Sequence, residues 1–351
     1  MNSIGENLKK IRLLKNLSLK QAGEILNMSA PAVAKYEKGE IVPNSQKLIE
    51  FANAYNVKTI DLLKSYNVPQ MQFTSFRKKK RLTGKNLELL ETLISEEISK
   101  YFEILELNNI ENNNIGLPKY NCNSYEDAEK SAEEFRNKFI NISSKLPISD
   151  LTNILENLGI IIVYMKNTNN KFDDFDGLSE IVDGKPVIVL LDDINDGARQ
   201  RFTIAHELGH LVLKNNNIDD IEEEKLCHRF ASALLMPKEA IIHEFGASRN
   251  KINFYELDAF KKEYKVSYKA IVYRLKDLNI ISDYLYKNLN VFLNKYIGKN
   301  DKYPIMTEQS YQFERIVYKL EADEIISTLK ACELLGVGLD EFNIKNNNYR
   351  H

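Results

Sequence analysis

Apolar positions follow helical spacing through most of the chain, and strand-like runs occur only in its middle third. Residues 4–64 contain five short helical patterns. After a polar stretch at 65–85, the apolar residues between 87 and 105 are three or four positions apart, as in one long amphipathic helix. The pattern predicts a mainly helical α+β protein.

Helix and strand patterns alternate from about residue 124. Short apolar, β-branched runs mark the strands, and Gly184-Lys185 suggests a hairpin between the last two. A helix is expected from 196 to about 214, and 284–343 again has helical spacing, ahead of an asparagine-rich tail at 344–351. The other expected elements are helices at 125–139 and 148–158 and strands at 160–165, 177–182 and 186–191.

Helix start and stop signals follow one another closely in the first 64 residues. Ser18 and Ser29 can each cap a helix, and Pro31 falls in a first turn, where its missing N–H does no harm. Asn27 lies in the break between these two helices, where a left-handed backbone is needed, and Gly39 ends the third helix. Two helices joined by so short a turn predict a helix-turn-helix, a geometry that reads DNA.

Charge is distributed unevenly, although the whole chain has a net charge of −2. Residues 1–85 carry sixteen Lys and Arg against six Asp and Glu, whereas the remaining 266 residues have a net charge of −12. The basic excess includes a run of five cations at 77–81. We call residues 1–65 the head. The excess of positive charge in and just after the head favours a polyanionic partner for this part of the chain alone, because the remaining residues are acidic.

Composition excludes several classes of protein. Hydrophobic residues make up 43% of the chain and charged residues 28%, which is enough apolar material for a packed core. No apolar run approaches the roughly 18 residues that a membrane span needs. Cys122, Cys227 and Cys332 lie far apart, which disfavours a disulfide framework and favours a reducing environment. We therefore expect a cytoplasmic protein with no membrane partner.

Residues 206–210 read His-Glu-Leu-Gly-His, an HExxH pattern within a predicted helix. Two imidazoles four residues apart lie on one face of a helix, so His206 and His210 can bind one metal ion. Glu207, beside the first of them, can take a proton from a water molecule on that metal. With five histidines in the chain, chance would produce the pattern roughly 0.01 times. We therefore predict a metal site.

A catalytic zinc ion takes three protein ligands and leaves its fourth position to water. The next predicted helix opens with a cluster of acidic residues, which can also stabilise the helix N-terminus by themselves. The spacing does not decide between Glu223 and Glu224 as the third ligand, because both can lie in line with apolar positions of that helix. The cluster consists of Asp219, Asp220, Glu222, Glu223 and Glu224.

The stretch SLKQAGEILNMSAPAVAKYEKGE at 18–40 resembles the Xre/Cro-type repressor head. The resemblance covers about the first 65 residues and implies a five-helix domain that binds double-stranded operator DNA. Ala22 and Gly23 stand where that family usually has Leu and Ala, and Asn27 replaces the usual turn glycine. The start of the recognition helix has few groups that hydrogen-bond base edges, so we expect methyl contacts with thymine there. The residues expected to face DNA are Gln21, Ser29, Ala30, Ala32, Lys35, Lys38, Asn44 and Ser45.

Two further motifs, RFTIAHELGHLVL and EKLCHRFASALLMP, resemble the ImmA/IrrE metallopeptidase family over about 125–245. The resemblance implies a zincin-like domain with a small β-sheet and one zinc ion per chain. It also implies that Glu224, six residues before the Phe-Ala pair, is the third ligand beside His206 and His210.

The second motif departs from the family's usual ExxANxFA pattern at two positions. Cys227 stands for Ala, and we interpret it as a small buried apolar residue. His228 stands for Asn, one helical turn beyond Glu224. It could therefore act as an alternative ligand or stabilise a transition-state oxyanion, and we rank it below Glu224 as a ligand.

The two resemblances together imply a DNA-binding transcriptional regulator with zinc-dependent endopeptidase activity. Its catalytic base would be Glu207, and its substrate an Xre-type repressor whose cleavage relieves repression. The alternative is a non-proteolytic, antitoxin-like DNA-binding regulator with a structural or sensory metal site. We favour the peptidase, because Glu207 has no use in a purely structural site.

The motifs divide the chain into four expected regions. The long helix at 87–105 could pair two copies of the chain in a homodimer, but packing on the following domain is the commoner use. Residues 260–281 look like a second helix-turn-helix in the acidic part, for which we favour packing or substrate docking. The regions are a helix-turn-helix domain at 1–65, a basic linker and long helix at 66–123, a metallopeptidase domain at 124–245 and a helical C-terminal region at 246–351.

Overall fold

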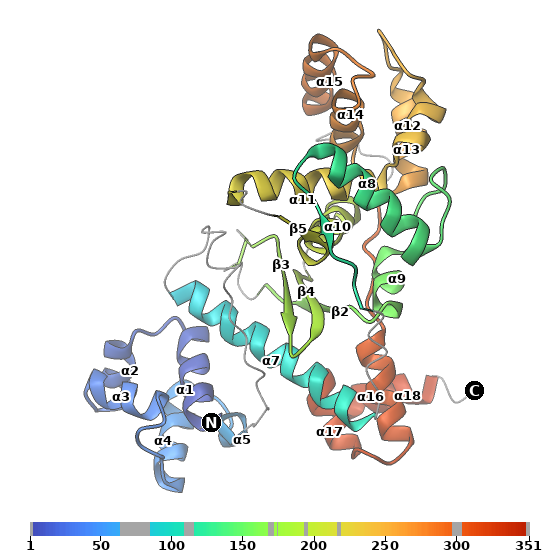
Figure 1. Ribbon diagram of the computed structural model, residues 1–351. Helices are drawn as coiled ribbons and strands as arrows, with labels where there is room; N and C mark the ends of the chain where they lie inside the picture. The colour runs from blue at the N-terminus through green and yellow to red at the C-terminus, as the bar shows by residue number, and fades with distance from the viewer. Residues whose placement is uncertain are drawn as a thin grey trace.

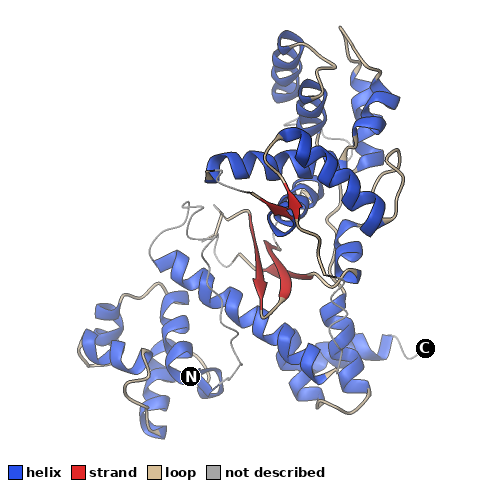
Figure 2. Cartoon of the chain, viewed as in Figure 1, coloured by secondary structure: helices blue, strands red, loops and turns tan. Residues whose placement is uncertain are grey.

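The protein is mainly helical, with two small β-sheets in the middle of the chain (Figures 1 and 2). Every helix in the described part is too short or too polar to span a lipid bilayer. The combination of many helices with small sheets confirms the expected mainly helical α+β class. The computed structural model describes residues 3–63, 85–108, 116–167, 172–173, 175–192, 196–215, 219–296 and 304–348, and most of the predicted linker at 65–85 lies outside these ranges.

The N-terminal head packs five helices around a small core of its own. Leu8, Phe51 and Leu62 are fully buried there. The guanidinium of Arg12 donates two hydrogen bonds to the buried carboxylate of Glu37, at 2.6 and 2.8 Å, which ties the first helix to the end of the third. The helices are α1 (Ser3–Leu14), α2 (Leu19–Ile25), α3 (Ala30–Glu37), α4 (Ser45–Tyr55) and α5 (Thr59–Leu63).

The structure explains two of the head's departures from the Xre pattern. A Cβ on Gly23 would lie 2.5 Å from the carbonyl oxygen of Met28, so the α2–α3 turn closes only over a glycine. Asn27 has a φ of 53°, the left-handed conformation expected for the turn. Ser18 and Ser29 cap α2 and α3 as predicted, and Ser18 forms a capping box with Gln21.

A three-stranded sheet lies at the centre of the middle part of the chain, in the order β2-β4-β3. The inner strand β4 runs parallel to β2 and antiparallel to β3. Asp183 and Gly184, with φ of 46° and 77°, form the two-residue turn of the predicted hairpin, one position earlier than expected. The strands are β2 (Ile161–Met165), β3 (Gly177–Val182) and β4 (Lys185–Leu191).

The two faces of this sheet are covered by different helices. Along β4, Ile188 and Leu190 belong to the core shared with α10, whereas Val187 and Val189 belong to the core shared with α7. Side chains along a strand alternate between its two faces, so alternate residues of β4 pack into the two different cores. In Figure 1, α7 passes along one side of the sheet and α10 lies on the other. The covering helices are α7 (Lys85–Leu107) and α10 (Gly197–Val212).

The long helix α7 connects three parts of the molecule (Figure 1). Its N-terminal half contacts α1, where Leu13 is buried against it and Lys9 Nζ lies 2.5 Å from a carboxylate oxygen of Glu88. A second ion pair joins Lys10 to Glu96. Near its other end, Ile104 is buried among the last three helices of the chain. The expectation that this helix packs on the following domain is confirmed.

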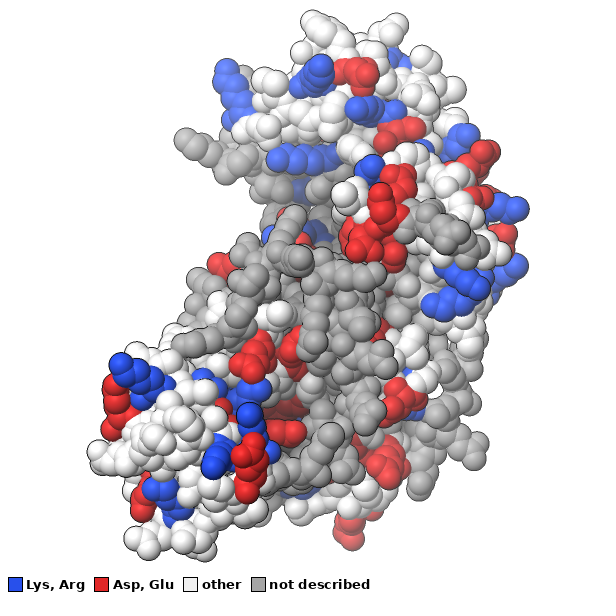
Figure 3. All heavy atoms as spheres, turned by 60° about the vertical axis from the view of Figure 1, so that its left-hand side comes forward, with Lys and Arg blue, Asp and Glu red and all other residues white. Residues whose placement is uncertain are grey.

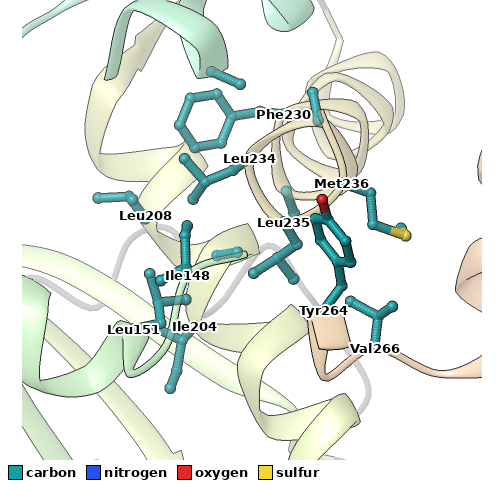
Figure 4. Close-up of a cluster of buried hydrophobic side chains, with 14 of the residues drawn as sticks. Ile148, Leu151, Ile204, Leu208, Phe230, Leu234, Leu235, Met236, Tyr264 and Val266 are labelled. Atoms are coloured by element: carbon teal, nitrogen blue, oxygen red, sulfur yellow. The ribbon is translucent and has the colours of Figure 1, made fainter. Parts of the chain in front are cut away.

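The helices around α10 complete the middle part of the chain. Figure 4 shows Ile204 and Leu208 of α10 beside Phe230 and Leu234 of α11, all four fully buried. The remaining elements here are β1 (Tyr120–Asn121), α8 (Tyr125–Phe135), the π-helical turn at Arg136–Ile140, α9 (Leu151–Asn157), β5 (Leu213–Lys214), α11 (Asp220–Leu235), α12 (Lys238–Phe245), α13 (Phe254–Tyr264), α14 (Tyr268–Asp277) and α15 (Asp283–Tyr296).

Two predicted helical stretches differ from the structure. The HExxH helix ends at Val212 rather than at Lys214, because Leu213–Lys214 pairs with β1 as a parallel strand. The expected helical region 284–343 is interrupted by an extended segment at 304–311, which we call the strap. After it come α16 (Gln312–Ala322), α17 (Thr328–Leu335) and α18 (Leu339–Asn348).

The strap is held on the N-terminal half of α10. The backbone N–H of Gly197 donates to the carbonyl of Ile305 at 3.0 Å, and Gln200 exchanges two hydrogen bonds with the backbone of Glu308. The Glu308 carboxylate pairs with Arg201, which is fully buried. A Cβ on Gly197 would lie 2.1 Å from the carbonyl oxygen of Met306, so this close approach requires glycine. No periodic pattern in the sequence indicates these contacts.

Candidate metal centre

The candidate site lies between α10 and α11, which pack side by side. Gly209 allows the close approach, since a Cβ there would lie 3.3 Å from the Cα of Cys227. Each helix begins with an aspartate that caps it, Asp196 for α10 and Asp219 for α11. The acidic residues after Asp219 stand in the first two turns of α11, and two of them, Glu223 and Glu224, contact histidines of the HExxH helix.

Donor atoms of three side chains converge between the helices. His206 Nε2 lies 3.1 Å from Glu224 Oε2 and 3.2 Å from His210 Nε2, and His210 Nε2 lies 3.3 Å from Glu224 Oε1. Bonds of zinc to nitrogen and oxygen near 2.1 Å in tetrahedral geometry place neighbouring donors about 3.3–3.4 Å apart. The spacing of these three side chains thus fits a single tetrahedral ion.

Glu223 lies on the other side of His210. Its Oε1 is 3.3 Å from His210 Nδ1, and the thiol of Cys227 is 3.4 Å from the same nitrogen. Glu223 and Glu224 therefore contact opposite edges of one imidazole. The sequence spacing leaves the third ligand open between them. In the structure, Glu224 lies against the Nε2 atoms of both imidazoles, and Glu223 lies against Nδ1 of His210.

The surroundings of His210 favour positive charge. Burial lowers the pKa of His210, but hydrogen bonds to Cys227, Glu223 and Glu224 raise it, with a net increase to about 12. Burial also raises the pKa of the Cys227 thiol. We therefore attribute the preference of His210 for positive charge to the two negatively charged carboxylates, because the thiol stays neutral. A divalent cation would benefit from the same environment and would displace the proton.

Glu207, the residue after His206 on α10, contacts β3. Ser179 Oγ donates a hydrogen bond of 2.7 Å to Glu207 Oε2, and both side chains are buried. Gly177, on the same face of β3, leaves room for this arrangement, because a Cβ there would lie 3.2 Å from Glu207 Cγ and 2.9 Å from Thr203 Cγ2. Sequence reasoning missed Ser179. Its only signal was a polar residue in an otherwise largely apolar strand.

His228 lies beside the three converging donors. Its ring centroid is 4.4 Å from that of His206, and on its other side it lies 5.7 Å from the ring of Phe202 at an interplanar angle of 25°. Ligand atoms of His206, Glu224 and His228 all lie within 4.8 Å of one another. Two overlapping triads therefore share His206 and Glu224. The triad with His210 is the tighter of the two.

The residues expected to face DNA lie on or beside α2, α3 and α4. Six of the eight are exposed, and only Ala30 and Ala32 are half-buried. Ser29 and Asn44 also act as N-caps, accepting hydrogen bonds from backbone N–H groups at 3.3 and 2.8 Å. In Figure 3, the head at the lower left shows Lys and Arg intermixed with Asp and Glu. The face of the head seen in this view thus carries charges of both signs.

Comparison with protein families matches two parts of the chain. The family described as Helix-turn-helix matches residues 8–62. The family described as the IrrE N-terminal-like domain, peptidase family M78, matches residues 155–276, which include the HExxH helix, α11 and the helical pair α13–α14. No curated protein matches the chain.

Proposed function

The chain joins an Xre-type helix-turn-helix domain to an IrrE N-terminal-like domain of peptidase family M78, and we propose that it is a DNA-binding regulator with zinc-dependent endopeptidase activity. The observation that carries this proposal is the convergence of His206 Nε2, His210 Nε2 and the Glu224 carboxylate, whose Oε2 lies 3.1 Å from the first nitrogen and whose Oε1 lies 3.3 Å from the second. In this assignment these side chains are the three protein ligands of one zinc ion.

In the proposed reaction, the zinc ion, Glu207 and Ser179 have separate roles. When bound, zinc would lower the pKa of a coordinated water to about 7 and polarise the scissile carbonyl. Glu207 takes the proton of the attacking water at Oε1 and passes it to the leaving amine nitrogen. Its other oxygen, Oε2, is occupied by the hydrogen bond from Ser179, which fixes the orientation of the carboxylate.

The substrate we propose is a transcriptional repressor with an Xre-type head like the one this chain carries. A helix-turn-helix domain implies DNA binding, and a peptidase domain implies a protein substrate. The head would bring the peptidase to operator DNA, with Gln21 and Lys35 toward bases and Lys38, Asn44 and Ser45 toward phosphates. This assignment of partners rests on the resemblance of the two domains.

A second candidate is a non-proteolytic regulator with a structural or sensory metal site. It is favoured by His228, which would give the site four protein donors, the number typical of structural zinc. The two candidates differ at Glu207, since only a peptidase needs a base there. Glu207→Gln retains zinc in both, but it abolishes repressor cleavage only if the chain is a peptidase.

Metal content tests the ligand assignment directly. Elemental analysis of the purified protein should give about one zinc per chain, and little in His206→Ala or Glu224→Ala. Retention of zinc by Glu224→Ala would move the third ligand to Glu223 or His228. Absence of zinc from the wild-type protein, even after zinc is supplied, would overturn the proposal.

A further inference from the structure

The two helices of the site each present a pair of donors one turn apart. On α10 the pair is His206 and His210, and on α11 it is Glu224 and His228. Residues four apart share a helix face, so each pair points into the space between the helices. The site thus offers four protein donors from two facing helices, one more than a catalytic zinc ion uses.

His228 differs from the other three donors in its distance and its exposure. The tighter triad is already spaced as in a tetrahedron, whereas the group that includes His228 spreads over as much as 4.8 Å. His228 is also exposed, whereas His206 is buried. A side chain on the surface of α11 can rotate without repacking the core beneath it.

Two aromatic neighbours define two places for the His228 ring. Toward the site it lies 4.4 Å from the ring of His206, and away from it the nearly parallel ring of Phe202 lies at 5.7 Å. Phe202 and His206 are themselves one turn apart on α10. A movement of His228 toward His206 brings a nitrogen into coordination range, and a movement toward Phe202 leaves the position open.

We propose that His228 is an exchangeable fourth ligand that closes the metal site in the resting protein and keeps the peptidase latent. This inference rests on the proposed function, because it concerns access to the same metal. A zinc ion with four protein ligands has no position for water or a substrate carbonyl. Withdrawal of His228 against Phe202 opens that position. The Asn that the resembling family usually has here lacks the imidazole that closes it.

The test uses Co²⁺ in place of zinc, because its visible absorption reports the ligands around it. The full-length protein is loaded with Co²⁺ and titrated with acetohydroxamate, a small chelating probe that needs open coordination positions. We expect His228→Ala and His228→Asn to bind the probe at least tenfold more tightly than the wild-type protein. We also expect His243→Ala, which removes an exposed histidine from α12, to behave as wild type.

Metal affinity gives a second readout that needs no substrate. Loss of a fourth ligand should weaken Co²⁺ binding by about tenfold in both His228 variants while leaving the protein folded by circular dichroism. Equal probe affinity in wild type and both variants would overturn the inference. Failure of both variants to hold Co²⁺ would also overturn it, since His228 would then be a permanent ligand.

These outcomes separate the inference from the function on which it rests. A wild-type protein that binds no Co²⁺ or Zn²⁺ contradicts the peptidase assignment itself. A wild-type protein that binds Co²⁺ and admits the probe as readily as His228→Ala leaves that assignment intact and removes only the latency. If His228→Ala then also loses peptidase activity, the residue acts as the oxyanion donor instead.

Discussion

Ser179 and Glu207 are joined by a buried hydrogen bond of 2.7 Å, although they are 28 residues apart and belong to different elements. The serine lies on β3, and the glutamate lies on the helix packed across it. The bond engages Oε2 of the proposed base, so the hydroxyl of Ser179 helps to fix the orientation of the carboxylate. The orientation of Glu207 thus depends on the sheet as well as on the HExxH helix.

We predict that Ser179→Ala lowers peptidase activity about tenfold while zinc content stays at the wild-type level. Without the hydroxyl, the Glu207 carboxylate loses the contact that fixes its orientation, but the ligand atoms of His206, His210 and Glu224 are untouched. Repressor cleavage and elemental analysis measure the two effects. Ser179→Thr keeps a hydroxyl and should recover part of the activity. Full activity in Ser179→Ala would show that the bond has no role in positioning.

The three consecutive glutamates of α11 should affect zinc affinity in a graded way. Glu224→Gln removes a proposed ligand and should have the largest effect. Glu223→Gln weakens the contact that holds His210 through Nδ1, so we expect a loss of about 10- to 100-fold. Glu222→Gln is the matched control, because Glu222 pairs with Lys225 rather than with a histidine.

Competition with a chromophoric chelator measures these affinities in solution. The order Glu224, Glu223, Glu222 is the specific expectation, with the largest loss first. A Glu223 variant that loses more zinc than the Glu224 variant would exchange the roles of the two residues.

Local patterns predicted the helices and the donors of the site, because both depend on short spacings. The HExxH pair needs only the helical repeat to place His206 and His210 on one face. The caps at Ser18 and Ser29 and the turn at Asn27 likewise depend on single residues and their immediate neighbours. The choice of Glu224 came from family resemblance, since spacing alone left Glu223 open.

The contacts that sequence reasoning missed join distant segments. Ser179 reaches Glu207 across a strand–helix interface, and the strap reaches α10 from more than 100 residues away. A lone serine in a strand is not part of a periodic pattern, and neither is an acidic residue such as Glu308 in a polar stretch. The sequence therefore does not show which distant residue each of them contacts. The β1–β5 pair is also only two residues long, too short to give a strand pattern.

The strap should stabilise the part of the chain around α10 through its ion pair with Arg201. Glu308→Ala leaves the guanidinium of Arg201 buried without its carboxylate partner, which typically costs about 3 kcal/mol. We expect the free energy of unfolding, measured by urea titration, to fall by that amount. Glu314→Ala, on the exposed surface of α16, is the control and should change it little. An equal effect in both variants would mean that the strap contributes no specific stabilisation.

Stability should also depend on pH through Glu156 of α9. Burial raises the pKa of Glu156 to about 7 from an ordinary 4.5, although a hydrogen bond from Ser310 acts in the opposite direction. Between these two values the folded protein holds a proton that the unfolded chain has released, so stability falls as pH rises through this window. The change is at most about 3 kcal/mol.

Glu156→Gln removes this titration while keeping an oxygen that can accept the hydrogen bond from Ser310. Urea unfolding at several pH values between 4.5 and 8 should therefore show a weaker fall in stability for the variant than for the wild type. The variant should be more stable than the wild type above pH 7, where the wild-type protein contains a buried carboxylate. Glu133→Gln alters an exposed residue of α8 and should follow the wild-type curve. Parallel curves for the wild-type protein and Glu156→Gln would show that the pKa of Glu156 is not raised by folding.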